Sequence, residues 1–147
     1  MLIEQPFIWP TRVYWEDTDA GGVVYHARYV AFMERARSEW MRALGWGQEA
    51  MRTGGEQVFV VRAMRLDFHK PARLDDALQV SVVLTQCRRA SLVMEQQVRR
   101  DGELLASASV RLAAVGAADF RPQPINAPML SVFEPLQVHT ESLRKKG

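Results

Sequence analysis

The sequence predicts an α+β domain in which an antiparallel five-stranded sheet curls around one long helix. Two patterns in the 147 residues carry this prediction. Between residues 27 and 44 apolar side chains recur at steps of three and four, and after residue 57 they alternate at steps of two. A helix and a sheet with broad apolar faces can bury those faces against each other, so we expect a single domain for residues 1–147.

The long helix is predicted from Ala27 to Leu44. One face is apolar at helical spacing, through Val30, Met33, Ala36, Trp40 and Leu44. Gly45 follows directly, where a helix C-cap is expected. Because further apolar residues widen this face, the sheet should cover much of the helix.

The strands are predicted from β-favouring residues and from alternation. The first is expected at Arg12 to Glu16, because Val13, Tyr14 and Trp15 favour extended structure. Four more strands should follow the helix as a meander. Their inward residues are Val58, Val60, Met64, Leu66 and Phe68, then Leu78, Val80, Val82 and Leu84, then Leu92, Met94 and Val98, and last Leu104, Ala106, Ala108, Val110, Leu112 and Ala114.

The C-terminal segment and the free surfaces of the sheet bear on assembly. About residues 118–147 are expected to form a wrap or tail, because prolines recur in this part of the chain. An open sheet keeps edges and a polar face, which invites edge-to-edge or face-to-face contacts. We therefore expect a homo-oligomer, either a dimer or a homotetramer.

Composition excludes several classes of function. The formal net charge is +2 and no nucleic-acid motif accompanies the cationic side chains, so no nucleic-acid partner is expected. Cys87 is the single cysteine and cannot form an internal disulfide, which fits a reducing compartment. The N-terminus lacks a signal-peptide pattern and no run of 18 apolar residues occurs, so a cytoplasmic location is expected.

Chemistry is expected in the segment Glu16 to His26, EDTDAGGVVYH. It holds three acids within four residues, which repel one another, and two adjacent glycines that let a backbone approach closely. No Ser, Thr, Asn or Asp occurs from residue 23 to residue 29, so the first helical amides lack a nearby side-chain cap. The pattern fits a carboxylate that faces an oxyanion site, although on these residues alone a structural Asp-rich turn explains it too.

The run YWEDTDAGGVVYH at 14–26 resembles the signature of the hot-dog thioesterases. The similarity continues through FMERAR at 32–37 and PARLDD at 71–76 to RRASL at 88–92, and it covers about residues 9–115. It is greatest to the Tol–Pal-associated acyl-CoA thioesterases, relatives of 4-hydroxybenzoyl-CoA thioesterase. The resemblance implies the hot-dog fold and hydrolysis of acyl-CoA, with a short-chain or aromatic acyl group, without a cofactor or a metal.

The resemblance also implies catalytic roles. The second acid of the D-x-D pair is catalytic in the family, which is Asp19 here, so Asp17 is expected either to shape the loop or to be exposed. The oxyanion donor of the family is a backbone N–H seven residues later, at His26, whose side chain we expect to orient the substrate, a water or Asp19. Asp19 would either attack the thioester carbonyl or deprotonate a water, and the sequence leaves both routes open.

The residues predicted to contact the substrate are Gly22, Tyr25, Tyr29, Val60, Arg88, Arg89 and Ser91. The two tyrosines fit the pocket wall or the core, and the strip 58–61 fits the acyl pocket or core packing. Arg88 and Arg89 suit the phosphates of coenzyme A, in the same or a neighbouring subunit, because guanidinium donors are forked and permanently charged. A solvated hairpin explains these two arginines equally well.

The alternative from a different class is a module that binds acyl-CoA or acyl carrier protein without catalysis. The uncapped helix start beside Asp19 argues against it, and an assay across acyl-CoA substrates separates the two hypotheses. Other hydrolase and nucleotide-binding designs are disfavoured, since no G-x-S-x-G elbow, P-loop or dinucleotide fingerprint occurs. The family's link to the Tol–Pal envelope machinery suggests acyl carrier protein or membrane-associated lipid enzymes as partners.

Overall fold

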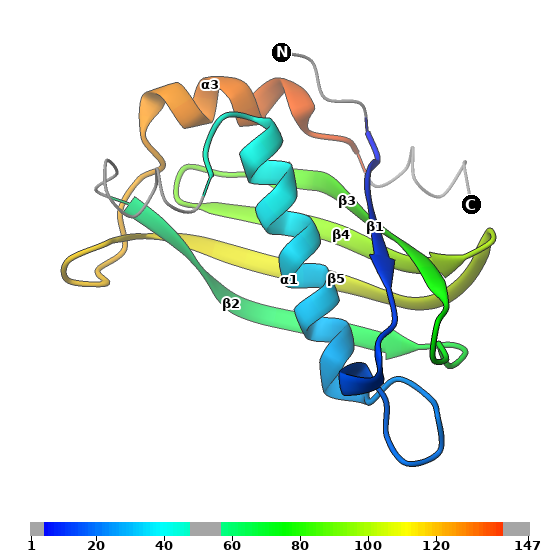
Figure 1. Cartoon of the computed structure of the whole chain (residues 1–147). Helices are drawn as coiled ribbons and strands as arrows, with labels where there is room; N and C mark the ends of the chain where they lie inside the picture. The colour runs from blue at the N-terminus through cyan, green and yellow to red at the C-terminus, as the bar shows by residue number, and fades with distance from the viewer. Residues whose placement is uncertain (1–4, 48–56, 140–147) are drawn as a thin grey trace.

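The computed structural model describes residues 5–47 and 57–139 of the chain. A five-stranded antiparallel sheet lies against one long helix, and a shorter helix covers one end (Figure 1). The elements are β1 (Phe7–Arg12), a 3-10 turn (Trp15–Asp17), α1 (His26–Ala43), β2 (Gln57–Phe68), β3 (Ala77–Cys87), β4 (Ser91–Arg100), β5 (Glu103–Gly116) and α3 (Ala127–Leu136). The predicted α+β class, with a sheet around one long helix, is confirmed.

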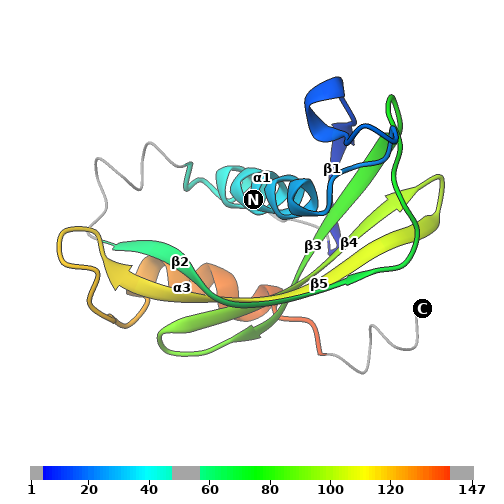
Figure 2. The same ribbon diagram turned by 90° about the horizontal axis from the view of Figure 1, so that it is seen from below.

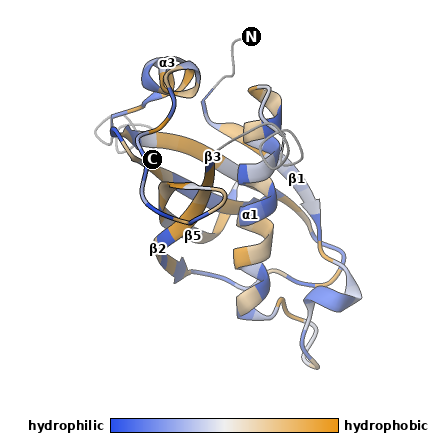
Figure 3. Cartoon of the chain, turned by 90° about the vertical axis from the view of Figure 1, so that its left-hand side faces the viewer, coloured by the Kyte–Doolittle hydropathy of each residue, from blue (hydrophilic) through white to orange (hydrophobic). Residues whose placement is uncertain are grey.

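The core lies between α1 and the concave side of the sheet, which bends around the helix in Figure 2. The buried apolar residues of α1 are Tyr29, Phe32, Met33, Ala36 and Trp40. All predicted inward residues of β3 and β4 are fully buried against them. Figure 3 shows hydrophobic residues along the strands beside α1. In β5 the prediction holds from Ala106 onward, whereas Leu105 is fully buried in place of Leu104.

The first strand lies earlier than predicted. β1 ends at Arg12 and pairs antiparallel with β3, while the strand predicted from Arg12 to Glu16 overlaps the 3-10 turn at Trp15 and Glu16. The buried carboxylate of Asp17 explains the turn, because its Oδ2 accepts a hydrogen bond from the Tyr14 amide at 2.9 Å. Tyr14 and Trp15 stay exposed, so this local hydrogen bond outweighs their preference for strands.

The four later strands do not form a simple meander. The order across the sheet is β1-β3-β4-β5-β2, so β2 pairs with β5 at the far edge. The chain therefore crosses from β2 at one edge to β3, which lies next to β1 at the other edge, through residues 69–76, which we call the crossover segment. Alternation along a strand reports which side chains face inward and not which strands are neighbours, which is why the prediction missed this crossing.

A bulge in β2 changes the face that its apolar residues present. The register with β5 shifts between Val61 and Ala63. On the N-terminal side of the bulge, Phe59 packs against the core. The cavity beside α1 is lined by Val58, Phe59 and Val61, but not by Val60, which was predicted to face inward with Val58. The alternation read from the sequence assumes a regular strand, so it did not account for the extra residue between Val61 and Ala63.

The predicted C-terminal wrap contains the helix α3. The Asn126 side chain caps it by accepting a hydrogen bond from the Met129 amide at 3.0 Å, and Pro128 lies in the first turn, which tolerates proline. Phe133 stacks on Trp40 of α1 with ring centroids 5.7 Å apart. Among the described residues, no helix combines the length and apolar character needed to cross a membrane.

Candidate active site

Asp19 belongs to the segment 18–25, which connects the 3-10 turn to α1, and this connecting loop is drawn in blue in Figure 1. Its amide donates to the Val23 carbonyl at 2.9 Å, and its carbonyl accepts from the Gly22 amide at 3.1 Å. The side chain is exposed, and its Oδ1 accepts a hydrogen bond from the Gly21 amide at 2.8 Å. None of the ion pairs between described residues involves Asp19, so its carboxylate is not neutralised by a cation there.

Two glycines allow the loop to close around this carboxylate. A Cβ added at Gly21 would lie 3.2 Å from Oδ1 of Asp19, and Gly22 adopts a φ of +80°, where a side chain is strained. The Gly22 carbonyl also accepts a hydrogen bond from the Leu74 amide at 3.2 Å, which ties the loop to the crossover segment. Gly22 therefore lies next to Asp19, and its contact with substrate stays a prediction.

Asp17 shapes the loop. Its side chain is 3% exposed and pairs with Arg28, whose Nη2 lies 2.8 Å from Oδ1. Its second oxygen accepts from the Tyr14 amide, and its main-chain carbonyl accepts from the Tyr25 amide at 2.9 Å. A carboxylate held by these contacts is not available to a substrate, so the two acids of the D-x-D pair have different surroundings.

Two backbone amides at the start of α1, those of His26 and Ala27, have no acceptor among the described residues. Tyr25 occupies the N-cap position and offers no side-chain hydrogen bond, and the Arg28 amide already bonds to the Tyr25 carbonyl at 2.8 Å. The positive end of the helix dipole coincides with these amides. The start of α1 can therefore stabilise a negatively charged oxygen.

A cavity of about 290 Å³ adjoins the start of α1. The residues that line it are Val24, His26, Tyr29, Phe68, His69, Lys70 and Pro71. The structure thus brings two of the predicted residues, His26 and Tyr29, to one cavity. Asp19 is not among the lining residues. It is close to the cavity in sequence, because its loop leads directly into the start of α1.

His69 and Lys70 were not predicted to belong to this site. They follow the end of β2, and they reach α1 because the crossover segment passes beside the helix start. His69 Nε2 lies 2.9 Å from the Ser107 hydroxyl, and Lys70 pairs with Glu103 at 2.7 Å. The sequence does place a histidine and a lysine directly before Pro71, but only the order of the strands puts this strand end beside the helix.

The two predicted tyrosines differ in burial. Tyr29 is 3% exposed, and its hydroxyl accepts a hydrogen bond from the Ala72 amide at 3.0 Å. Removal from water raises the pKa of the Tyr29 hydroxyl. Tyr25 is about half exposed, with its ring centroid 4.4 Å from that of His26. Tyr29 therefore forms both core and cavity wall, and Tyr25 flanks the helix start.

Arg88, Arg89 and Ser91 lie at the opposite end of the sheet. They form the turn between β3 and β4, where the Arg88 amide bonds to the Ser91 carbonyl at 2.9 Å. The loop of Asp19 is anchored at the other end of β3, since its Gly22 carbonyl accepts a hydrogen bond from the Leu74 amide, three residues before β3 begins. β3 has 11 residues, so its ends are roughly 30 Å apart. Within one chain the two arginines are therefore not brought to Asp19.

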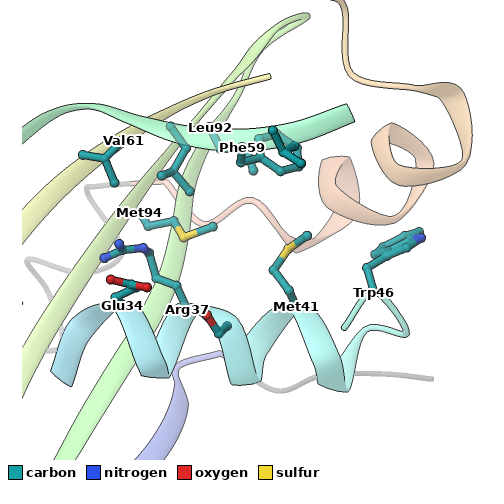
Figure 4. Close-up of a pocket in the computed structure, with 11 residues that line it drawn as sticks. Glu34, Arg37, Met41, Trp46, Phe59, Val61, Leu92 and Met94 are labelled. Carbon is teal, nitrogen blue, oxygen red and sulfur yellow. The ribbon is translucent and has the colours of Figure 1, made fainter. Parts of the chain in front are cut away.

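A second cavity of about 410 Å³ lies between α1 and the sheet (Figure 4). Three residues of the strip 58–61, which was predicted for the acyl pocket or core packing, line this cavity, namely Val58, Phe59 and Val61. Val60 is not among the lining residues, so its contact with substrate stays untested. This cavity borders the middle and C-terminal half of α1, away from the helix start.

The arrangement of Asp19 and the helix start suits chemistry at a carbonyl carbon. An exposed carboxylate can act as a nucleophile or as a base toward water. Amides without an acceptor can bind the oxygen that becomes negative when a carbonyl is attacked. Among the described residues, no group of three or more His, Cys, Asp or Glu side chains is placed to hold a metal ion.

Comparison with known proteins gives a consistent result. The family model of the thioesterase superfamily matches residues 21–107. The acyl-CoA thioester hydrolase YbgC of Escherichia coli O157:H7 is 45% identical over 130 residues, which are 87% of this chain and 96% of that protein. The acyl-CoA thioesterase YbgC of Haemophilus influenzae is 37% identical over 136 residues, 92% of this chain and 100% of that protein.

A solved structure is also similar in sequence and fold. It is described as a probable thioesterase from Bartonella henselae, and it is 35% identical to this chain. The TM-score is 0.77, and the match covers 82% of this chain and 99% of that one.

Proposed function

This chain belongs to the thioesterase superfamily and is an acyl-CoA thioesterase, and from that premise we propose that Asp19 is its catalytic carboxylate. The start of α1 is then the oxyanion site, with His26 as the principal donor. The observation that supports this most is a contrast within the D-x-D pair. Asp17 is buried in an ion pair, whereas the Asp19 carboxylate is exposed and precedes two amides that have no acceptor within the described part of the chain.

The proposed chemistry follows the charge on the thioester. When its carbonyl carbon is attacked, the oxygen becomes negative, and the amides of His26 and Ala27 donate hydrogen bonds to it. One such donor is worth about 3–4 kcal/mol in known enzymes. The carbon–sulfur bond then breaks, and coenzyme A leaves as a thiolate. Because this thiolate is a good leaving group, no strong general acid is needed.

Asp19 can serve on two routes. As a nucleophile it attacks the carbonyl carbon and forms a mixed anhydride, which water then hydrolyses to the free acid. As a general base it takes a proton from the water that attacks the same carbon. On both routes the free acid and coenzyme A are the products, and the carboxylate must reach the carbonyl carbon or its attacking water.

We propose a short-chain or aromatic acyl group as the substrate. The cavity beside the helix start measures about 290 Å³, just below the usual range of about 300–1,000 Å³ for ligand pockets. Val24, Tyr29 and Phe68 give it apolar walls. A panel of acetyl-, butyryl-, octanoyl- and benzoyl-CoA tests this preference, and octanoyl-CoA as the best substrate would contradict it.

We further propose that the site is completed by a second copy of the chain. β2 is at the edge of the sheet, and its outer side has no partner strand among the described residues. If two β2 edges pair antiparallel, the Phe68 end of one copy lies beside the Gln57 end of the other. Gln57 pairs with Gly116 and Ser91 pairs with Ala113, so the β3–β4 turn is at that same end. Arg88 and Arg89 of the second copy would then approach the coenzyme A phosphates.

The role of Asp19 is tested by Asp19→Asn, which keeps the shape of the side chain and removes its charge. We expect kcat/KM for butyryl-CoA and benzoyl-CoA to fall by about 10²–10⁴-fold, the usual contribution of such a group. Release of the coenzyme A thiol measures the rate. Glu16→Gln is the matched control, since Glu16 is exposed and close in sequence, and it should keep wild-type activity. Wild-type turnover by Asp19→Asn would refute the proposal.

A further inference from the structure

The larger cavity contains a buried cation in apolar surroundings. Its lining includes Met41, Phe59, Leu92 and Met94, and Arg37 reaches into it from α1 (Figure 4). Arg37 is 7% exposed, and its burial lowers the pKa of the guanidinium. A buried charge is costly unless it is paired and hydrogen-bonded. The partners of this guanidinium therefore decide what the cavity can bind.

Gln96 supplies one hydrogen bond to Arg37. The Arg37 Nη1 donates to the Gln96 Oε1 at 2.9 Å. The Gln96 Nε2 donates to the carbonyls of Met33 at 3.0 Å and Ser81 at 3.3 Å. The amide must therefore turn its oxygen toward Arg37, and this orientation ties α1 to β3 and β4. Gln96 is neutral, so it accepts a hydrogen bond from the Arg37 guanidinium without balancing its positive charge.

The charge of Arg37 is not balanced by an ion pair among the described residues. Glu34 is one helical turn earlier and lies beside Arg37 at the same end of the cavity in Figure 4. It raises the pKa of Arg37 through space, but it is exposed and forms no ion pair with it. A guanidinium has five N–H donors, and the described residues accept a hydrogen bond from only one of its nitrogens.

We propose that this cavity binds an apolar chain that ends in a carboxylate, with the carboxylate on Arg37. The apolar part would lie along the side chains toward Met41 and Trp46, at the other end of the cavity in Figure 4. A carboxylate matches the forked donors of arginine and supplies the missing negative charge. The volume of about 410 Å³ lies within the range of ligand pockets.

Two molecules related to the enzymatic reaction carry this chemistry. One is the free carboxylic acid that thioester hydrolysis releases. The other is an acyl-CoA whose acyl group has a second carboxylate at its far end. Both would place a carboxylate on Arg37. The free acid would extend its apolar chain toward Met41 and Trp46, whereas the acyl chain of the acyl-CoA would reach Arg37 from the start of α1. The binding itself does not depend on the role of Asp19.

The first arm of the test measures binding of octanoate and of 1-octanol to the full chain by calorimetry. We expect Arg37→Gln to lose about tenfold or more of the octanoate affinity, as for a hydrogen bond to a charged group, and to leave 1-octanol binding nearly unchanged. Arg37→Gln retains an amide donor for Gln96, and Arg37→Lys keeps the charge and should restore most of the affinity. Arg35→Gln, an exposed arginine on the same helix, is the matched control.

Glu34→Gln supplies a readout that a merely structural role of Arg37 would not move. Removing the neighbouring negative charge should strengthen octanoate binding by a few-fold, because the carboxylate of Glu34 repels that of the ligand. A purely structural arginine would leave octanoate affinity independent of Glu34. If Glu34→Gln and Arg37→Gln both leave the octanoate affinity unchanged, the cavity is not a binding site for the free acid.

The second arm compares hydrolysis of hexanoyl-CoA with that of adipyl-CoA, which has an added terminal carboxylate. A preference for adipyl-CoA that disappears in Arg37→Gln identifies the far end of the acyl group as the ligand. Octanoate binding that depends on Arg37 identifies the free acid. If neither depends on Arg37, the inference is wrong, even if Asp19→Asn is inactive and the proposed catalytic role holds.

Discussion

At the scale of single residues, Asp17 and Asp19 show how position within one loop sets the role of an acid. Both follow β-favouring residues, and the sequence alone does not distinguish their environments. In the structure Asp17 pairs with Arg28 and accepts a hydrogen bond from the Tyr14 amide. The Asp19 carboxylate accepts one from the Gly21 amide alone among the described residues. The choice of Asp19 came from the resemblance to hot-dog thioesterases, since the burial of Asp17 depends on how the loop folds back on α1.

The structural role of Asp17 gives a stability prediction. Asp17→Ala removes the partner of Arg28 and leaves the Tyr14 amide without an acceptor. We expect the free energy of unfolding to fall by about 2 kcal/mol, the usual cost of leaving partly buried polar groups unpaired. Urea titration measures this, and Glu16→Ala at the exposed neighbouring position should change it by less than about 0.5 kcal/mol. Equal effects of the two variants would contradict the role given to Asp17.

At the scale of elements, the crossover segment holds the site together. Its Ala72 carbonyl accepts from the Val24 amide, its Ala72 amide donates to the Tyr29 hydroxyl, and its Leu74 amide donates to the Gly22 carbonyl. These three bonds join the site loop, α1 and the crossing between β2 and β3. Period and composition predicted α1 closely and the inward faces of β3 and β4. They did not predict the crossing itself, because neighbouring strands are chosen by packing between distant segments.

Tyr29→Phe tests the link between α1 and the crossover segment. The variant leaves the Ala72 amide without its acceptor, so we expect a loss of about 1–2 kcal/mol in the free energy of unfolding at pH 7. Burial raises the pKa of Tyr29 above that of the unfolded chain, so its contribution is complete below about pH 10 and declines as the pH rises further. The difference between wild type and variant should shrink above pH 10 in urea titrations. A constant difference would contradict the burial of an unionised hydroxyl.

Two elements were misplaced or missed for local reasons. The strand predicted from Arg12 to Glu16 became a 3-10 turn because Asp17 captures the Tyr14 amide. Recurring prolines indicate irregular chain and so did not predict α3, although Pro128 occupies its first turn, where proline is compatible with a helix. His69 and Lys70 could not be predicted as part of the candidate site, because the strand order, which places the end of β2 beside the start of α1, was not predicted.

At the scale of the whole molecule, the main question is how one coenzyme A ester is bound. The catalytic loop and the Arg88–Arg89 turn lie at opposite ends of β3 within a chain. The edge of β2 is available for a second copy, and antiparallel pairing there would bring the two features together. We therefore treat the dimer as part of the proposed active site, and assembly and coenzyme A affinity should be linked.

The dimer gives a prediction with two readouts. Arg88→Ala with Arg89→Ala should raise KM for butyryl-CoA by about tenfold or more through lost charge-assisted hydrogen bonds, with a smaller effect on kcat. Arg99→Ala, at the other end of β4, is the control. Light scattering should give a dimer or a larger assembly, and Val61→Arg in the exposed part of β2 should shift it toward the monomer and reduce activity. A fully active monomer would contradict a shared site.

The central claim is that the Asp19 carboxylate and the first amides of α1 act on one thioester carbonyl. The most direct measurement is a crystal structure of Asp19→Asn with butyryl-CoA bound. We expect the carbonyl oxygen within about 3.2 Å of the His26 or Ala27 amide nitrogen, with the side chain of residue 19 facing the carbonyl carbon or a water beside it. A thioester bound with its carbonyl on other donors, and with residue 19 turned away from it, would contradict the claim.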